Sequence, residues 1–536
     1  MTTLPAITKS NGRLHHPDGT FADYITLRFP PNSLNFRDID QSEPQVKLQD
    51  IAHLRYYQAR ERGEDAPIII AFLLLEQDRP VEQIFPGISS TTPQGETLLS
   101  ANSFITHTLR ELLSRGWLHY ENKNWQVAAP KSASGWQERG QAVINLLISQ
   151  DRLLLYPGPD RLPPARPDLS DFPVYKNLIP IGGCAFLSDL VWRERPRLVF
   201  DAAFFLLEHD DFFSHHSALG EAYNLWVSGG IIHRPPLYRR GAIFHSDRWQ
   251  IAFLGLDDLE ITLPTGLDLR PRDLALAGKA IPFTLNDDGP SDLTLYTRYY
   301  GVSGQGRVLG HTPAAPDRFE LTVIDRRVVS WQRGGKLALP QNGFIISFAP
   351  NVLSDGEQRE LQKALRTQPL LDYRFARPQH QSINQAIQIG PILLQDGRSP
   401  LTNTYLEERE QFWPSRNLDN GHWQIGVVST DYKTDIDQSR HARVGLGIDK
   451  NGDLILVMVA CVKPALRVPG VESAGATLTE LASLLAEAGA VDALNLDGGG
   501  SAQAYYMGGR AIVPGDRRGL PLIHYERMVP SVGVVL

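Results

Sequence analysis

The residues best suited to chemistry form one short stretch, Asn495-Leu-Asp-Gly-Gly-Gly-Ser501. Asp497 could act as an acid, a base or a nucleophile. Three consecutive glycines are costly in backbone entropy, and they are useful where the chain adopts positive φ or a ligand touches the main chain. Their N–H groups could form a nest that binds an anion. The stretch therefore predicts a carboxylate beside a phosphate or oxyanion cradle; the alternative is a structural turn in which Asp497 bonds its own loop.

The elements that must position this stretch can be predicted from the preceding residues. Residues 491–496 read as a short buried strand that delivers Asp497 at its end. A helix is expected at 478–488, because its leucines recur on one face, Thr477 and Glu480 form a capping box, and Gly489 ends it.

A β-hairpin is predicted just before that helix. Residues 444–448 and 454–459 are apolar strands, and Asp449-Lys-Asn-Gly452 between them is a hairpin turn. Further strands are expected at 199–205, 251–263, 293–300, 319–331 and 343–348. The chain after residue 166 is therefore expected to have an α+β fold, with mixed β-sheets and flanking helices.

The order of several motifs resembles the phosphodiester glycosidase family. The helix start Gly475-Ala-Thr-Leu-Thr-Glu-Leu-Ala482, followed by Ala493 to Ser501, is similar to the family's signature. The flanking blocks that agree in the same order are Leu295 to Gly301, Leu339 to Ser347, Ile389 to Gly397, His441 to Ile448 and Glu526 to Val529. The resemblance covers about residues 195 to 536 and is strongest from 385 onward.

One block departs from the family pattern. The family usually has an asparagine and two glycines before two phenylalanines, whereas this chain has Asp201-Ala-Ala-Phe-Phe205. A contact made by the segment Asp201–Ala203 must therefore differ, which bears on substrate and activity.

The resemblance implies hydrolysis of the C1–O bond between a sugar and a phosphate diester. A phosphate is already a good leaving group, so binding its charge helps more than protonating it. Arginine suits this task, because its planar fork matches phosphate oxygens. The predicted catalytic residues are Asp497, Arg443, Glu526 and Glu480, and the predicted substrate-binding residues are Asn495, Gly498, Gly499, Gly500, Ser501, His441 and Arg527.

Each of these residues also has a structural interpretation. Arg443 and Glu526 could form ordinary salt bridges, and Ser501 could cap its turn. The capping box explains Glu480 without catalysis. A group of histidines and aspartates at 209–216 raises the possibility of a metal site, but its spacing fits no standard zinc or calcium loop, and a solvated loop is the alternative. We expect neither a metal nor an organic cofactor.

The proline-rich stretch at 156–167 predicts a linker or long loop. A boundary is therefore expected between an N-terminal module at 1–165, of unknown function, and the catalytic domain at 166–536. Within the module, residues 46–62 and 103–115 have helical periodicity, residues 67–75 read as a strand, and residues 117–127 as a short hairpin. The pattern indicates a smaller α/β or winged-helix-like module.

Composition limits the function classes. The chain has 536 residues and a formal net charge of −7, so a general basic field for nucleic acid is absent. Its two cysteines, Cys184 and Cys461, are expected to be buried thiols. The start lacks the apolar core of a signal peptide and the longest apolar run is too short for a membrane span, so the expected location is cytoplasmic, although the family is often exported.

Two other functions remain possible from the sequence. The chain could be a metal-dependent phosphodiesterase that cleaves the P–O bond, or a non-catalytic protein that binds carbohydrate or sugar phosphate. The expected partner is in each case a sugar phosphodiester or a glycan, and neither a membrane nor nucleic acid.

Overall fold

The structure is a computed structural model. It describes residues 6–39, 184–206, 220–274, 280–300 without 288 and 290, 310–366 without 351, 370–412, 439–462, 467, 469–515 and 524–536. It also describes the backbone of the short strands β4 (Leu118–Glu121), β5 (Asn124–Val127), β6 (Leu154–Leu155), β7 (Val174–Asn177), β23 (Arg416–Asn417) and β24 (Trp423–Gln424).

A six-stranded sheet carries the residues that lead to Asp497. Its order is β1-β2-β26-β25-β27-β22. The strands are β1 (Thr8–His15), β2 (Phe21–Phe29), β22 (Ile392–Leu394), β25 (Arg443–Asp449), β26 (Leu454–Val459) and β27 (Ala490–Asn495). Strands β25 and β26 form the predicted hairpin, and all thirteen of their residues are buried, seven on β25 and six on β26. Central strands that are covered on both faces read as continuous apolar runs, which is the pattern seen here.

Helix α9 (Leu478–Glu487) covers one face of this sheet. The capping box is confirmed: the Thr477 hydroxyl accepts from the Glu480 N–H at 3.1 Å, and the Glu480 carboxylate accepts from the Thr477 N–H at 2.8 Å. Gly489 follows the helix with φ +95°, as its predicted stop requires. The buried leucines at 478, 481 and 485 pack against the sheet and fix the direction in which β27 leaves the helix.

A five-stranded sheet lies beside the end of β27, with the order β29-β28-β8-β31-β3. Its strands are β3 (Leu34–Asp38), β8 (Leu198–Asp201), β28 (Ala504–Tyr506), β29 (Gly509–Arg510) and β31 (Ser531–Val535). Helix α7 (Leu187–Glu194) contacts β8 and β28. Strand β8 ends at Asp201, whose N–H donates to the Gln503 carbonyl, so Asp201 lies beside the segment that joins β27 to β28.

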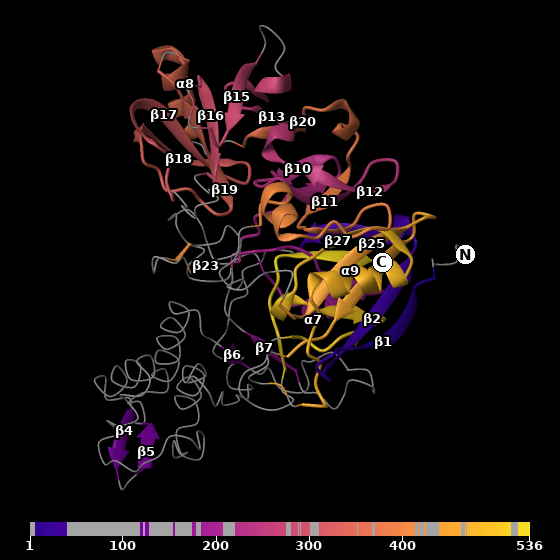
Figure 1. Cartoon of the computed structure of the whole chain (residues 1–536). Helices are drawn as coiled ribbons and strands as arrows, with labels where there is room; N and C mark the ends of the chain where they lie inside the picture. Colours follow the sequence, from indigo (N-terminus) through magenta and orange to yellow (C-terminus); the bar gives the residue numbers. More distant parts are fainter. Residues whose placement is uncertain are drawn as a thin grey trace.

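Most of the remaining described strands form two larger sheets, which lie to one side of the six-stranded sheet (Figure 1). One has the order β10-β9-β21-β11-β12, and the other β18-β17-β19-β16-β15-β14-β13-β20. The first comprises β9 (Trp226–Ser228), β10 (Ile231–Arg234), β11 (Arg240–His245), β12 (Trp249–Leu254) and β21 (Gln385–Gln388). The second comprises β13 (Leu259–Thr262), β14 (Asp268–Pro271), β15 (Ile281–Leu285), β16 (Leu293–Thr297), β17 (Ala314–Ile324), β18 (Arg327–Gly335), β19 (Gly343–Phe348) and β20 (Asp372–Phe375), with helix α8 (Asp355–Leu365) beside β18.

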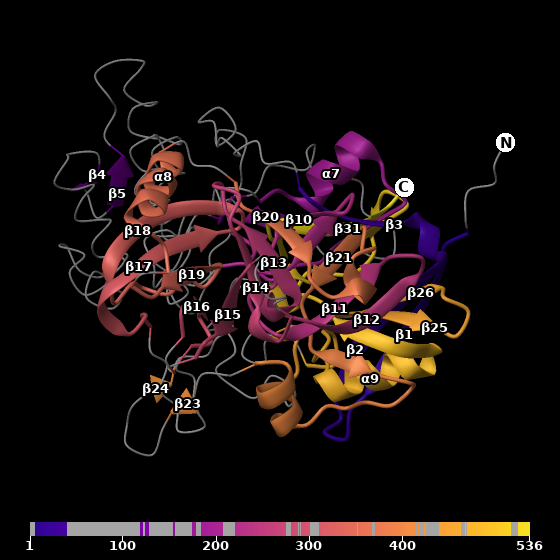
Figure 2. The ribbon, with the colours of Figure 1, turned by 90° about the horizontal axis from the view of Figure 1, so that it is seen from above.

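The first residues of the chain belong to the same sheets as the last ones. Strand β2 pairs with β26, and β3 pairs with β31, so β1 and β2 lie beside the C-terminal strands in both views (Figures 1 and 2). Leu27 and Phe36 are fully buried in this arrangement. The predicted boundary at 165/166 placed residues 6–39 in a separate module, and sequence periodicity could not reveal a pairing between segments more than 400 positions apart.

Most other predictions of elements can be compared directly with the structure. The α+β fold with mixed sheets and flanking helices is confirmed. The hairpin expected at 117–127 is present as β4 and β5. The helices predicted at 46–62 and 103–115, the strand at 67–75 and the proline-rich stretch at 156–167 lie outside the described residues. Both cysteines are buried thiols. In the part of the chain that is described, no helix is long and apolar enough to cross a membrane.

Candidate active site

Asp497 lies in the loop that follows β27, at the junction of the six-stranded and five-stranded sheets. Its residue is only 8% exposed, and one carboxyl oxygen accepts the Gly498 N–H at 2.8 Å. The Gly499 N–H donates to the Ala442 carbonyl at 2.8 Å, and the Ser501 N–H to the Gly498 carbonyl at 3.1 Å. Because these three N–H groups have partners within the protein, the structure gives little support to the predicted anion nest.

Two of the loop glycines are required for different reasons. A Cβ on Gly498 would lie 2.7 Å from the Ala442 carbonyl oxygen, so the loop can approach β25 only without a side chain there. Gly499 has φ +58°, a conformation that side chains rarely adopt, and a Cβ on it would have no neighbour within 4 Å. The loop is therefore held against β25 on one side and is open on the other.

Asp201, at the end of β8, is in hydrogen-bonding contact with Asp497. It is completely buried, and neither of its carboxyl oxygens accepts a well-aligned hydrogen bond from an N–H or O–H group of a described residue. Burial and the negative charge of Asp497 raise the pKa of Asp201 well above its ordinary value. Burial also raises the pKa of Asp497, to about 7. Two buried carboxyls in contact share protons, because both cannot ionise cheaply.

Arg527 brings a positive charge to this pair of carboxyls. It is partly exposed, and its charge lowers the pKa of both Asp497 and Asp201 against the effect of burial. The Ser501 hydroxyl lies between them, since it hydrogen-bonds Asp497 and accepts from Arg527 Nη1 at 3.4 Å. Gln503 fixes the Arg527 backbone by a reciprocal pair of hydrogen bonds, each 3.0 Å long. The site thus combines acid, base and cation within one small region.

Three other predicted residues, Asn495, Arg443 and His441, make contacts with the backbone of neighbouring segments. The Asn495 amide donates to the Gly390 carbonyl at 3.0 Å and so holds β27 against the segment before β22. Arg443 is buried, and its guanidinium donates to the carbonyls of Ala476 at 3.0 Å and Ser439 at 2.8 Å. His441 pairs with Ala476 through a backbone bridge. These contacts fix β27 and β25, the two strands next to the loop of Asp497.

The two predicted glutamates serve helix ends. Glu480 completes the capping box of α9 and also contacts His16 at 3.0 Å. Glu526 is buried and accepts the Ser188 N–H at 2.8 Å, in the first turn of α7, where a negative charge is favourable. Neither contact involves Asp497, so the structure provides a structural task for each glutamate.

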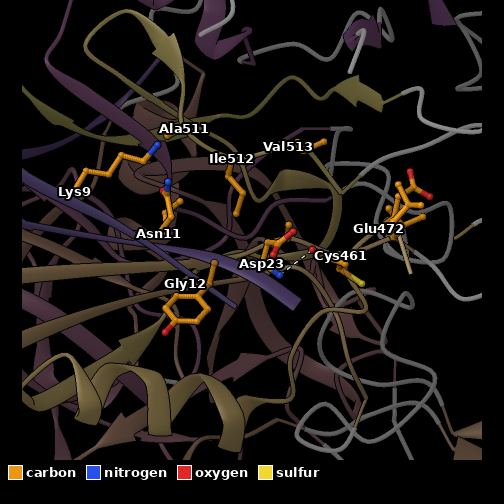
Figure 3. A pocket seen from close by; sticks show the side chains of 15 residues that line it. Lys9, Asn11, Gly12, Asp23, Cys461, Glu472, Ala511, Ile512 and Val513 are labelled. Atoms are coloured by element: carbon orange, nitrogen blue, oxygen red, sulfur yellow. Dashed lines mark hydrogen bonds between the residues drawn. The ribbon is translucent and has the colours of Figure 1, made fainter. Parts of the chain in front are cut away.

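A separate pocket of about 320 Å³ lies between the β1–β2 hairpin, the end of β26 and residues 511–513. Figure 3 shows Lys9 and Asn11 on one side of it and Ile512 and Val513 on another. Its lining includes neither Asp497 nor Asp201. The pocket is therefore distinct from the carboxyl pair.

Sequence reasoning noted Asp201 as a departure from the family pattern but did not include it among the site residues. A signal was present, because an aspartate at the end of an apolar strand resembles the position of Asp497 after β27. The contact between the two could not be predicted, since they are nearly three hundred positions apart. Gln503 gave no signal in the sequence.

Within the described residues, no group of three His, Cys, Asp or Glu side chains is arranged to hold a metal ion. The histidines and aspartates at 209–216 lie outside the described residues. The described site comprises a carboxyl with a pKa of about 7, a second carboxyl that holds its proton more tightly, a hydroxyl and a guanidinium. This set can exchange a proton near neutral pH and can neutralise an anionic group.

Comparison with known proteins relates the C-terminal part of the chain to one family. Residues 319–536 match the family model of the phosphodiester glycosidases. The matched stretch includes Asp497 and Arg527, whereas Asp201 lies before it. No curated protein matches the chain.

Among solved structures, a protein of Synechocystis has 16% identity and a TM-score of 0.40, with 98% of this chain and 62% of that chain covered. This chain thus spans under two thirds of that protein. A protein of Burkholderia pseudomallei has 16% identity and a TM-score of 0.38, with 99% and 96% covered. The catalytic domain of zebrafish N-acetylglucosamine-1-phosphodiester alpha-N-acetylglucosaminidase, auto-inhibited by its pro-peptide, has 16% identity and a TM-score of 0.22, with 60% and 89% covered.

Proposed function

We propose that this protein hydrolyses the glycosidic C1–O bond of a sugar phosphodiester, with an N-acetylhexosamine-1-phosphodiester or a related sugar-phosphate conjugate as the substrate class. The observation that carries this proposal is the arrangement of Asp497, whose buried carboxyl has a pKa of about 7, next to the partly exposed Arg527. The match of residues 319–536 to the phosphodiester glycosidases supports the same reaction type.

Asp497 is the group best placed to take a proton. In the proposed step a water oxygen attacks C1 of the sugar. The bond between C1 and the bridging oxygen breaks, and its electron pair stays on that oxygen, which leaves as part of the phosphate. The proton of the water passes to the Asp497 carboxylate. A base whose pKa lies near the working pH combines a useful ionised fraction with strong proton affinity.

Arg527 neutralises the charge that this step creates. The phosphodiester carries one negative charge, and the released phosphate monoester carries a second after the C1–O bond breaks. A guanidinium can bind two phosphate oxygens at once, and its attraction grows as the charge develops. Ser501, which already bonds Arg527 and Asp497, keeps the cation and the base in one geometry.

The test is incubation of the purified protein with a panel of sugar-1-phosphodiesters in heavy-oxygen water. Release of free sugar that carries the heavy oxygen supports C1–O cleavage. Heavy oxygen in the phosphate product would instead establish P–O cleavage, the reaction of a phosphodiesterase. Saturable binding of the same compounds without any product would establish a binding protein, which is the other alternative.

A further inference from the structure

Asp201 occupies an unusual position for a buried carboxyl. It ends a strand at the centre of the five-stranded sheet, it is 0% exposed, and its two oxygens lack a well-aligned donor among the described residues. Its own N–H donates to the Gln503 carbonyl at 3.1 Å, and the next N–H, of Ala202, donates to the Ser531 carbonyl at 3.2 Å. These two N–H groups therefore have backbone partners, and the Asp201 carboxyl contacts that of Asp497.

Two ionised carboxylates have no proton with which to form a hydrogen bond to each other. Their contact is favourable only when one of them is protonated and donates to the other. Asp497 is the less buried member, at 8% exposure against 0% for Asp201, and it accepts hydrogen bonds from the Gly498 N–H and the Ser501 hydroxyl. These donors favour the anion on Asp497 and therefore leave the proton on Asp201.

We infer that Asp201 is a positioning residue, a protonated carboxylic acid that donates a hydrogen bond to Asp497 and keeps it in the anionic, reactive form. Asp201 is completely buried, so it presents no surface that a substrate could touch. This inference rests on the proposed hydrolysis and adds a regulatory consequence to it. The site is active only as a monoanion, so activity should fall when the pair gains a second proton and also when it loses its last one.

The groups around the pair agree with this assignment. Arg527 is the cation that faces it and offsets a single negative charge. Cys184, which precedes α7, is a neutral thiol there, because burial raises its pKa. Asp38 on β3 belongs to a separate ion pair with Arg234, at 2.6 Å.

The protonation of Asp201 can be tested with Asp201→Asn. This substitution introduces an amide of the same shape, which can donate a hydrogen bond but cannot ionise. The wild type should show a bell-shaped dependence of kcat/KM on pH. In Asp201→Asn the alkaline limb should disappear, and the optimum value should fall by less than about tenfold, since a donor is retained. In Asp201→Ala the donor is lost, so the acid limb should move to higher pH and kcat/KM should fall by more than about tenfold.

Glu320→Gln provides a matched control. Glu320 is another buried carboxyl with a raised pKa, on β17 in the eight-stranded sheet, and its partners Ser347 and Thr312 are hydroxyls that tolerate an amide. Its pH profile should equal that of the wild type. An alkaline limb that persists in Asp201→Asn, or that disappears in Glu320→Gln as well, would overturn the assignment.

A measurement of stability separates this inference from the proposed reaction. If the wild type turns over no substrate, the proposed function fails. The shared proton of Asp201 and Asp497 is then tested by the melting temperature alone. Carboxyls with raised pKa values stabilise the fold when protonated, and that contribution is lost as pH rises from their unfolded values toward their folded ones. The melting temperature of the wild type should therefore fall more steeply than that of Asp201→Asn between about pH 4 and pH 7. Equal slopes would overturn the shared proton.

Discussion

The imidazole of His16 lies against the carboxylate of Glu480, with Nδ1 and Oε1 3.0 Å apart, although 464 positions separate the two residues in sequence. The other ring nitrogen of His16 lies 3.0 Å from the Gly475 carbonyl. This contact joins the turn of the β1–β2 hairpin to the first turn of α9. Glu480 thus connects the N-terminal strands to the helix that precedes the active-site loop.

Glu480→Ala should therefore reduce stability and leave catalysis largely intact. It removes the capping-box acceptor and the His16 contact, which should cost about 1 to 2 kcal/mol in the free energy of unfolding. The measurement is urea denaturation, together with kcat of the folded protein. A variant that folds as the wild type does but has no activity would show that Glu480 is a catalytic carboxylate.

Asp497→Asn should abolish turnover while the fold is retained. The substitution is nearly isosteric and keeps an acceptor for the Gly498 N–H, but it removes the base. Loss of a positioned acid or base typically lowers the rate by about 10²–10⁴-fold. The variant should have a normal circular dichroism spectrum and should still bind a sugar phosphodiester in calorimetry. Wild-type rates in this variant would exclude Asp497 from the reaction.

Arg527→Lys and Arg443→Lys should differ in their dependence on the leaving group. Lysine retains the charge but not the planar fork. For Arg527→Lys, kcat/KM should fall by about tenfold or more on a sugar phosphodiester and much less on a neutral aryl glycoside of the same sugar. Arg443 donates to the backbone carbonyls of Ala476 and Ser439, so its replacement should lower stability and affect both substrates equally.

The comparison uses two substrates for each variant, so a general loss of folded protein cancels. If Arg443→Lys showed the selective loss and Arg527→Lys did not, the phosphate would be bound at Arg443. Equal losses on both substrates for both variants would place the phosphate site elsewhere in the protein.

Gly499→Val should damage the site more than the fold. Its φ of +58° disfavours a β-branched side chain, at a cost of about 1 to 3 kcal/mol, and the side chain would project to the open side of the loop. Gly508→Val is the matched control, because Gly508 has φ +79°, is equally open and lies in the β28–β29 turn. Both variants should lose similar stability, but only Gly499→Val should lose kcat/KM, by about tenfold or more. Equal activity in the two would show that the loop backbone does not approach the substrate.

A fragment of residues 166–536 should fail to fold by itself. It lacks β2 and β3, so the edges of β26 and β31 would be unpaired, and the buried surfaces of Leu27, Phe29 and Phe36 would be missing. Each such side chain contributes about 1.5–3 kcal/mol when buried, and exposed strand edges promote aggregation. Size-exclusion chromatography should show aggregates.

The matched control for this experiment is a chain in which residues 1–39 are joined to residues 166–536 by a flexible linker. It should be monodisperse and show cooperative thermal unfolding. A fragment of 166–536 that is equally monodisperse and cooperative would mean that the first strands are an addition to a domain that folds without them.

Much of the local structure could be predicted from the sequence because it depends on neighbouring residues. The capping box of Thr477 and Glu480, the turn at Asp449 and the strand that leads to Asp497 involve contacts within a few positions. The sequence also indicated Asp497 as a candidate functional residue, because a carboxylate before three glycines is unusual at the end of a buried strand. The same residues carried the resemblance to the phosphodiester glycosidases.

The tertiary structure alone decided which residues meet Asp497. Asp201 arrives from β8 and Arg527 from the segment after β30 (His524–Glu526), and their proximity depends on long-range strand pairing that no sequence period encodes. Tertiary packing also gave Arg443 backbone partners. The pKa of Asp497 depends on burial and on neighbours brought from distant positions, so only the folded chain raises it to about 7.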